Sequence, residues 1–171
     1  IGLGSGDTGN ISFTAANTTT APISGTIEVT PTFTNDGVSC TGLSETFIIT
    51  VNPAGQVNSV DDQQLCHDNA TDEITFSTNN TVGSTLYSWV NNNTDIGLAA
   101  SANDVTNIPS FTALNIGTER DTAQIIVTPT FTYDGQSCQG VADTFYIIVD
   151  PEPSVTSAAA KTICDGSSVN Y

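Results

Sequence analysis

The chain contains a long internal repeat. Residues 29–34 read Val-Thr-Pro-Thr-Phe-Thr, and the same six residues recur at 127–132. The offset is 127 − 29 = 98 residues, and the same step relates Pro53 to Pro151. Because this offset is long and constant, it indicates that whole domains are repeated in tandem.

The repeat predicts one complete unit and two partial ones. With Pro53 and Pro151 as unit ends, residues 54–151 form a complete unit, residues 1–53 the C-terminal half of an earlier unit, and residues 152–171 the start of the next. Ile1 aligns with Ile96, so the first unit lacks everything that matches residues 54–95. We therefore expect the chain to be a segment of a longer array.

The complete unit shows the alternation of apolar and polar residues that is typical of half-buried strands. Residues 124–133 and 144–149 both alternate, and Asp134-Gly135 between them favours a tight hairpin turn. Pro129 should lie at an edge or a bulge, because proline cannot donate to a ladder. Further strands are predicted at 56–60, 73–78, 86–90 and 109–113, with a shorter one near 96–99. The expected core residues are Tyr87, Trp89, Phe111, Val127, Phe131, Phe145, Ile147 and Val149.

Six or seven short strands in about a hundred residues predict an all-β fold of tandem immunoglobulin-like β-sandwich domains. The set of Tyr-x-Trp at 87–89, Val-Thr-Pro-Thr-Phe, Ser-Cys-x-Gly and Val-x-Pro resembles PKD-like and Ig-like repeat domains. Such domains occur in series in giant cell-surface proteins of Bacteroidota, including gliding-motility adhesins. The Gly-Asp-Gly that follows the Trp strand in PKD domains is replaced here by residues 90–94. The resemblance implies a cell-adhesion role.

The charge balance excludes two classes of partner. The chain has 18 acidic residues against two basic ones, Arg120 and Lys161, which gives a net charge of −16. Nucleic acids and anionic membranes are bound by clustered Lys and Arg, so neither is an expected partner. Direct membrane insertion is not expected either, because no apolar run reaches the roughly 18 residues of a membrane helix.

The four cysteines follow the repeat, which favours disulfide chemistry in a secreted, extracellular protein. Three pairings are compatible with the sequence: Cys66 with Cys138 inside one unit, Cys40 with Cys66 and Cys138 with Cys164 across units, or each cysteine with a unit outside this segment. One pair per unit favours Cys66–Cys138, with Cys40 and Cys164 bonded to neighbouring units. An Ig-like topology opposes this pair, because it separates the two by more than the roughly 6 Å that Cα atoms allow.

Three other features suggest binding or modification. Tyr87 and Trp89 could stack on a sugar, although a central strand favours the core for both. Acidic groupings at 61–62, 68–73 and 91–95 offer oxygen ligands for calcium, although none matches an EF-hand loop. Asp121-Thr122-Ala123 resembles the short O-glycosylation motif of Bacteroidota, which makes Thr122 a candidate glycosylation site.

No catalytic motif is present: the chain has one His and lacks Gly-x-Ser-x-Gly and a phosphate loop. We therefore expect no enzymatic activity and no cofactor other than calcium. The expected role is a structural stalk or spacer in a long secreted cell-surface adhesin. Its partners would be neighbouring units of the same chain, surface polysaccharide or other cell-surface proteins. The alternatives are a carbohydrate-binding accessory module of a secreted polysaccharide-degrading enzyme, and an adhesive unit that contacts a partner through its loops.

Overall fold

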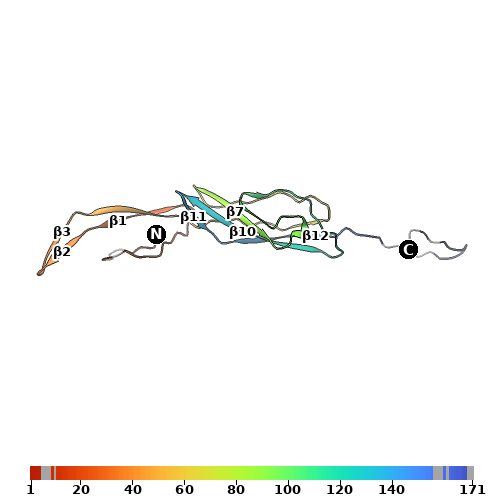
Figure 1. Ribbon diagram of the computed structural model, residues 1–171, viewed down its shortest axis with the longest axis horizontal. Helices are drawn as coiled ribbons and strands as arrows, with labels where there is room; N and C mark the ends of the chain where they lie inside the picture. The colour runs from red at the N-terminus through yellow and green to blue at the C-terminus, as the bar shows by residue number, and fades with distance from the viewer. Residues whose placement is uncertain (5–8, 10, 156–159, 161, 169–171) are drawn as a thin grey trace.

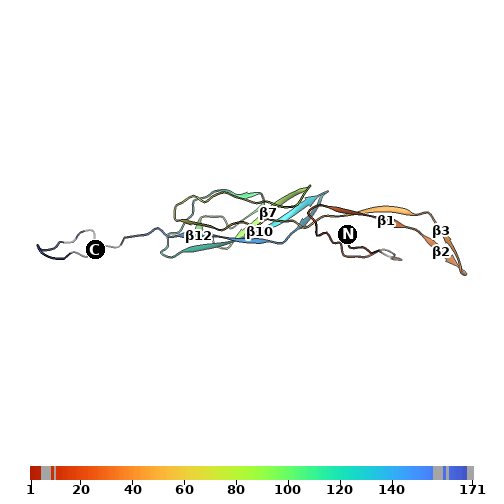
Figure 2. The same cartoon turned by 180° about the vertical axis from the view of Figure 1, so that it is seen from behind.

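The computed structural model describes residues 1–4, 9, 11–155, 160 and 162–168, and the regular secondary structure of these residues is almost entirely β-strand. These residues form an elongated molecule, with the first-copy strands at one end and the complete unit in the middle (Figure 1). The view from behind shows the same order along the long axis (Figure 2). In the described part of the chain, no helix is long and apolar enough to cross a membrane.

The first copy consists of two antiparallel strand pairs. β1 (Ile23–Val29) pairs with β4 (Glu45–Val51), and β2 (Thr32–Asn35) pairs with β3 (Val38–Thr41). Asp36 and Gly37 join β2 to β3 with φ angles of 48° and 79°. Positive φ angles at both positions are what a tight Asp-Gly hairpin turn requires.

The complete unit is built on a six-stranded sheet in the order β5-β12-β10-β7-β8, with β11 paired to β10. β5 runs parallel to β12, and the other pairs are antiparallel. A second, two-stranded sheet pairs β6 with β9. A short 3₁₀ helix, η1, precedes β8. The elements are β5 (Gln63–Cys66), β6 (Ile74–Thr75), β7 (Ser84–Asn91), η1 (Thr94–Ile96), β8 (Ser101–Val105), β9 (Asn107–Ile108), β10 (Asp121–Tyr133), β11 (Gln136–Gln139) and β12 (Asp143–Asp150).

The core lies between the large sheet and the segments that carry β6 and β9. Along β10, buried residues alternate with partly exposed ones from Ala123 to Phe131, as the period of a half-buried strand requires. Ile74 of β6 and Ile108 of β9 belong to the same apolar cluster, which gives the unit a β-sandwich-like, two-layered core. Seven of the eight expected core residues are buried, and Phe111 is half-buried against them; the seven are Tyr87, Trp89, Val127, Phe131, Phe145, Ile147 and Val149.

The two copies share loop geometry as well as strands. Asn17 in the first copy donates from Nδ2 to the carbonyls of Ala21 and Val51, both at 2.8 Å. Its counterpart Asn115 donates to the carbonyls at the two matching positions, at 2.8 and 2.7 Å. The φ angles of Gly2 and Gly97, which occupy equivalent positions, are 93° and 92°. The sequence repeat is therefore also a structural repeat.

Pro129 lies where β10 changes partners. Pairing with β12 ends at Val127, and pairing with β11 begins at Thr130. On that side of β10, no ladder bond is needed from the two residues between them, Thr128 and Pro129. In the first copy, Pro31 occupies the break between β1 and β2. Pro129 is thus not at the predicted edge or bulge, since it lies inside the central strand β10 and is paired with Tyr87 of β7; it is tolerated because no strand is paired with it on the other side.

Several strand predictions were wrong. Residues 56–60 and 109–113 are not strands, residues 73–78 contain only β6, and residues 96–99 overlap the end of η1. In residues 56–60, backbone donors are bound by other groups: Gln56 N–H donates to Asn80 Oδ1 at 2.8 Å, and Val60 N–H to Asp143 Oδ2 at 3.2 Å. The hydrogen bonds of residues 56–60 therefore do not form a ladder.

Candidate functional site at the junction between units

The linker between the two copies lies on the hairpin of the complete unit. Asn52 donates from Nδ2 to the carbonyl of Tyr133 at 2.9 Å and to that of Gln136 at 3.4 Å, on either side of the β10–β11 turn. Gly55 N–H donates to the carbonyl of Cys138 in β11 at 3.1 Å. The hairpin tip of one unit is thus bonded to the segment that leaves the preceding one.

Two glycines allow this close approach. A Cβ on Gly140 would overlap the carbonyl oxygen of Gly55, and a Cβ on Gly55 would lie 2.7 Å from the carbonyl oxygen of Pro129. Real Cβ atoms do not approach backbone this closely, so any side chain at either position would push the linker off the hairpin. At Gly42, the first-copy counterpart of Gly140, the nearest atom is the flexible ring carbon Cγ of Pro31 at 2.9 Å.

A second contact joins the units on the loop before β7. Thr81 donates from its backbone N–H to the carbonyl of Thr20 at 2.8 Å, and its hydroxyl lies 3.5 Å from the same oxygen. Thr20 belongs to the first-copy loop that Asn17 holds in place. Two separated points, the linker and this loop, therefore fix the complete unit to the copy before it.

The opposite end of the complete unit presents the matching loop. The counterpart of Thr20 is Thr118, and the loop around it borders an open surface hollow of about 610 Å³. Ile116 in this loop is 95% exposed. The hollow is lined by Asp95, Leu114, Asn115, Ile116, Gly117, Thr118, Glu119, Arg120 and Asp121.

A polar cluster fixes the end of β12 beside this hollow. Asp150, the counterpart of Asn52, accepts hydrogen bonds from Gln64 Nε2 and Arg120 Nε, each at 2.8 Å. The bond from Gln64, together with the bond and charge of Arg120, lowers the pKa of Asp150 below its ordinary value. The carboxylate therefore stays ionised while it holds β5 and the 114–121 loop together.

All four cysteines are free, and the predicted Cys66–Cys138 disulfide is not formed. Cys138 pairs with Phe131 near one end of β10, whereas Cys66 pairs with Asp150, one residue beyond the point where β12 meets Asp121 at the other end. Ten residues of β10 span about 33 Å at roughly 3.3 Å per residue. A disulfide requires Cα atoms within about 7 Å, so this pair is wrong for the folded unit.

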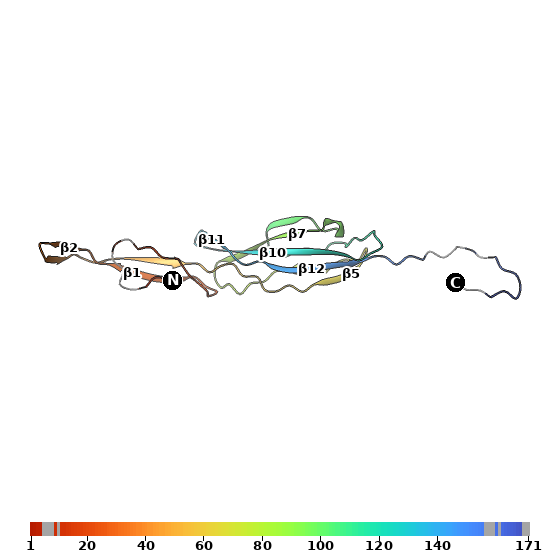
Figure 3. The same cartoon turned by 90° about the horizontal axis from the view of Figure 1, so that it is seen from below.

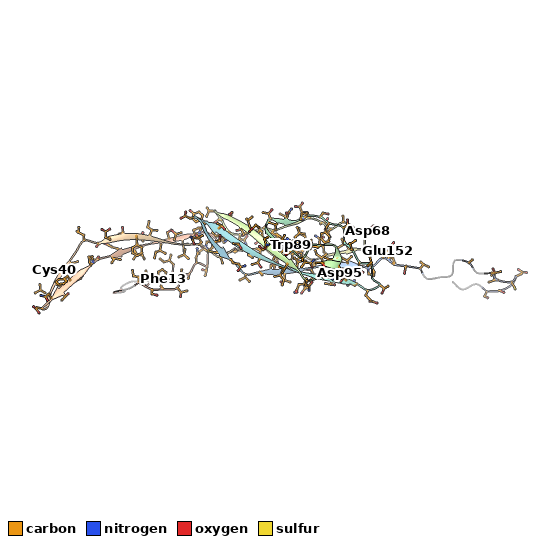
Figure 4. All side chains as sticks on the ribbon, in the orientation of Figure 1. Phe13, Cys40, Asp68, Trp89, Asp95 and Glu152 are labelled. Carbon is orange, nitrogen blue, oxygen red and sulfur yellow. The ribbon has the colours of Figure 1, made fainter. Side chains whose placement is uncertain are left out.

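The cross-unit pairing of Cys40 with Cys66 is excluded on the same ground. Cys40 lies at the outer end of the first copy, whereas Asp68, two residues after Cys66, lies at the far end of the complete unit (Figure 4). Cys66, Cys40 and Cys164 are exposed, and Cys138 is half-buried. Only pairing with a unit outside this segment remains of the three predicted arrangements for Cys66.

The aromatic pair of β7 is not available to a sugar. Tyr87 and Trp89 are only 3% and 4% exposed, and the ring of Phe76 packs 5.1 Å from that of Tyr87 between centroids. Burial raises the pKa of the Tyr87 hydroxyl, and a hydrogen bond with Thr78 partly offsets this. Both residues therefore serve the core.

The acidic groupings considered for calcium use several of their groups in hydrogen bonds within the protein. Asp62 accepts from the backbone N–H of Tyr146 at 2.7 Å, and Asp72 is bonded through its backbone to the side chain of Gln63. Asn93 caps η1 by accepting from the N–H of Asp95 at 3.0 Å. Among the described residues, no three His, Cys, Asp or Glu side chains are grouped to hold a metal ion.

Thr122 lies on the outward face of β10 and is exposed, so its hydroxyl is accessible. Its glycosylation remains a prediction. Comparison of the chain with protein-family models and with the curated proteins finds no match.

Proposed function

We propose that this chain is a structural segment of a tandem array, in which immunoglobulin-like, PKD-like sandwiches are stacked end to end as the stalk of a long secreted cell-surface adhesin. The observation that carries the proposal is the junction. The complete unit is bonded to the copy before it through its hairpin and its 78–83 loop, and it presents a matching loop at its other end.

The strand directions suit a load-bearing stalk. The chain reaches the complete unit along the linker at its hairpin end, and it leaves from β12 at the opposite end (Figure 3). A pull on both ends would load the sheet along its strands, where β10 is bonded to both β7 and β12. Many ladder bonds would then have to break together, which resists force better than sequential opening.

The linker favours stiffness. A free linker of a few residues would allow the units to swing, but Asn52 and Gly55 are both bonded to the hairpin that follows. The bonds from the linker to the hairpin and the bond from Thr81 to Thr20 lie at separate points. Bending between the units at one of these points would therefore strain the contact at the other. Stacked units of this kind would keep a functional tip at a distance from the cell surface.

Small-angle scattering of the 171-residue chain tests stiffness directly. We expect a radius of gyration that matches the extended arrangement, unchanged by salt. Substitution of Gly140 by Ala should increase flexibility, and Gly42→Ala serves as the matched control. A compact or widely varying ensemble in the unsubstituted chain would contradict a rigid stalk.

Glycan binding separates the stalk from the carbohydrate-module alternative. Since Tyr87 and Trp89 are buried, we expect no saturable binding of the chain to polysaccharides on a glycan array. Tight binding of one glycan class that survives high salt would favour the module and reject a pure spacer.

A further inference from the structure

We propose that successive units are joined by disulfides between the Cys66 position of one unit and the Cys138 position of the next. This inference rests on the proposed array. It accounts for the free state of all four cysteines, because every partner would then lie in a unit outside this segment.

The register of β5 places Cys66, the first of the two thiols, at the end of the unit where β12 ends and the chain leaves. Cys66 pairs with Asp150 in the parallel β5–β12 ladder, and the N–H of the next residue, His67, donates to the carbonyl of Asp150 at 2.8 Å. The Cys66 position is thus one strand spacing, about 4.8 Å, from the last residue of β12. Cys66 is exposed there.

The contacts at the junction place the second thiol, that of Cys138 in the following unit, near the same linker. Asp150 corresponds to Asn52, which is bonded to Tyr133 and Gln136 on the hairpin of the following unit. Cys138 lies two residues beyond Gln136, and its carbonyl is bonded to Gly55 of the linker. At a junction between two complete units, the two cysteines would therefore flank the same linker.

The hollow at the end of the complete unit is the surface on which the next unit would dock. Its loop corresponds to the first-copy loop that bonds Thr81 through Thr20. The same surface is therefore occupied at the junction that the structure contains. Cys66 and this loop are joined by His67, whose Nδ1 accepts from the N–H of Asn115 at 2.8 Å.

Formation of each bridge oxidises two thiols to one disulfide. One thiolate attacks the disulfide of a thiol-oxidising protein, and the second thiolate displaces that protein from the mixed disulfide. The oxidant leaves as two thiols, which carry the two electrons and the two protons that the cysteines lose. An exposed thiol beside a half-buried one suits this exchange, because the exposed thiol can reach the disulfide of the oxidant.

The first test uses a longer chain, to which the part that the first unit lacks has been added. An extended chain carries residues 54–95 before Ile1, so that Asp95 precedes Ile1 as it precedes Ile96 in the complete unit. Its upstream copy of Cys66 should bond to Cys138. Trypsin cleaves only after Arg120 and Lys161, the two basic residues of the chain, which releases Cys138 on the fragment 121–161.

After oxidation, the monomeric extended chain should keep the 121–161 fragment attached to the N-terminal fragment until a reductant is added. Replacing the upstream Cys66 by Ser should free the fragment, and the same substitution in the original Cys66 should not. Reduction should also lower the melting temperature by about 10 °C. Release of the 121–161 fragment when the original Cys66 is replaced, or free thiols at both the upstream Cys66 and Cys138 in a folded, oxidised chain, would overturn the proposal.

A second extended chain tests the downstream junction independently. Residues 74–171 added after Tyr171 continue the repeat, because position 172 corresponds to residue 74. The original Cys66 should now bond to the added copy of Cys138. In each extended chain, one Cys66 and the Cys138 of the next unit are expected to bond. If either chain folds and these two thiols stay free, the disulfide proposal is rejected. A chain that scatters as a rigid rod with free thiols would still support the stalk, whereas specific glycan binding would reject the stalk whatever the thiols do.

Discussion

The two copies of the hairpin have nearly the same sequence and the same ladders but very different burial. Phe33 is 72% exposed and its counterpart Phe131 is 0% exposed. Val29 and Val127 differ likewise, at 44% and 0%. The turn angles and the bond from Gly42 or Gly140 to the preceding proline are shared. Local sequence is thus sufficient for the strands of this hairpin, but not for its core.

The difference comes from the segment that the first copy lacks. In the complete unit, β6 contributes Ile74, and β7 contributes Tyr87 and Trp89, all buried against β10 and β12. Nothing equivalent covers the apolar face of β1 and β4 within the described residues. The same side chains should therefore contribute differently to the free energy of unfolding, and matched substitutions can measure this.

The largest contrast is expected for the phenylalanines. Phe131→Ala should lower the free energy of unfolding by about 3–5 kcal/mol, because it leaves a cavity in a closed core. Phe33→Ala should cost less than about 0.5 kcal/mol, since its ring is largely in water. Urea unfolding followed by circular dichroism measures both. Equal costs would mean that the first copy is covered in solution.

The second contrast concerns the junction glycines. Gly140→Ala should cost about 1–3 kcal/mol through overpacking against the backbone of Gly55. Gly42→Ala should cost much less, because the ring of Pro31 can shift. Hydrogen exchange at the Gly55 amide gives a specific readout, because this N–H bonds to Cys138. Unchanged protection in Gly140→Ala would show that the linker is not held by the hairpin.

The hairpins and most of the core could be predicted from the sequence. The alternation in residues 124–133 and the Asp-Gly turn are local signals, and a period of two places every second residue of such a strand on the inward face. Tyr133 was the exception on the inward face: it is 39% exposed, because it lies at the tip, beyond the segments that cover β10.

The weaker strands and the junction could not be predicted in the same way. β5 is mostly polar, Gln-Gln-Leu-Cys, and owes its place to the parallel ladder with β12. The 98-residue offset revealed Gly42 and Gly140 as equivalent positions, but not that Gly55 would pack on only one of them. Such contacts depend on how two distant segments meet in space, and a single sequence carries no signal for that.

The third contrast uses two asparagines with the same bonds. Asn115→Ala should cost about 1–3 kcal/mol, because Asn115 is 6% exposed and its loss leaves buried carbonyls without a donor. Asn17→Ala removes the equivalent bonds at a partly exposed site, where water can replace them, and should cost under about 1 kcal/mol. Thermal unfolding of both variants measures the difference. Equal losses would mean that hydrogen-bond geometry matters here more than burial.

The smallest contrast is between Asp150 and Asn52, which end equivalent strands. The bonds from Gln64 and Arg120 lower the pKa of Asp150, so its contribution to stability is present above the unfolded pKa of about 3.9 and is lost as the pH falls through the lowered folded value. At neutral pH, Asp150→Asn should lower the melting temperature by about 1–2 °C, since the group is exposed. At a pH well below the lowered folded pKa, where Asp150 is protonated, the variant and the parent chain should melt together. Asn52→Ala is the control, because an amide does not titrate and its effect should not vary over the same pH range. If the melting temperatures of Asp150→Asn and the parent chain still differed at low pH, the contribution of Asp150 would come from the shape of its side chain and not from its charge.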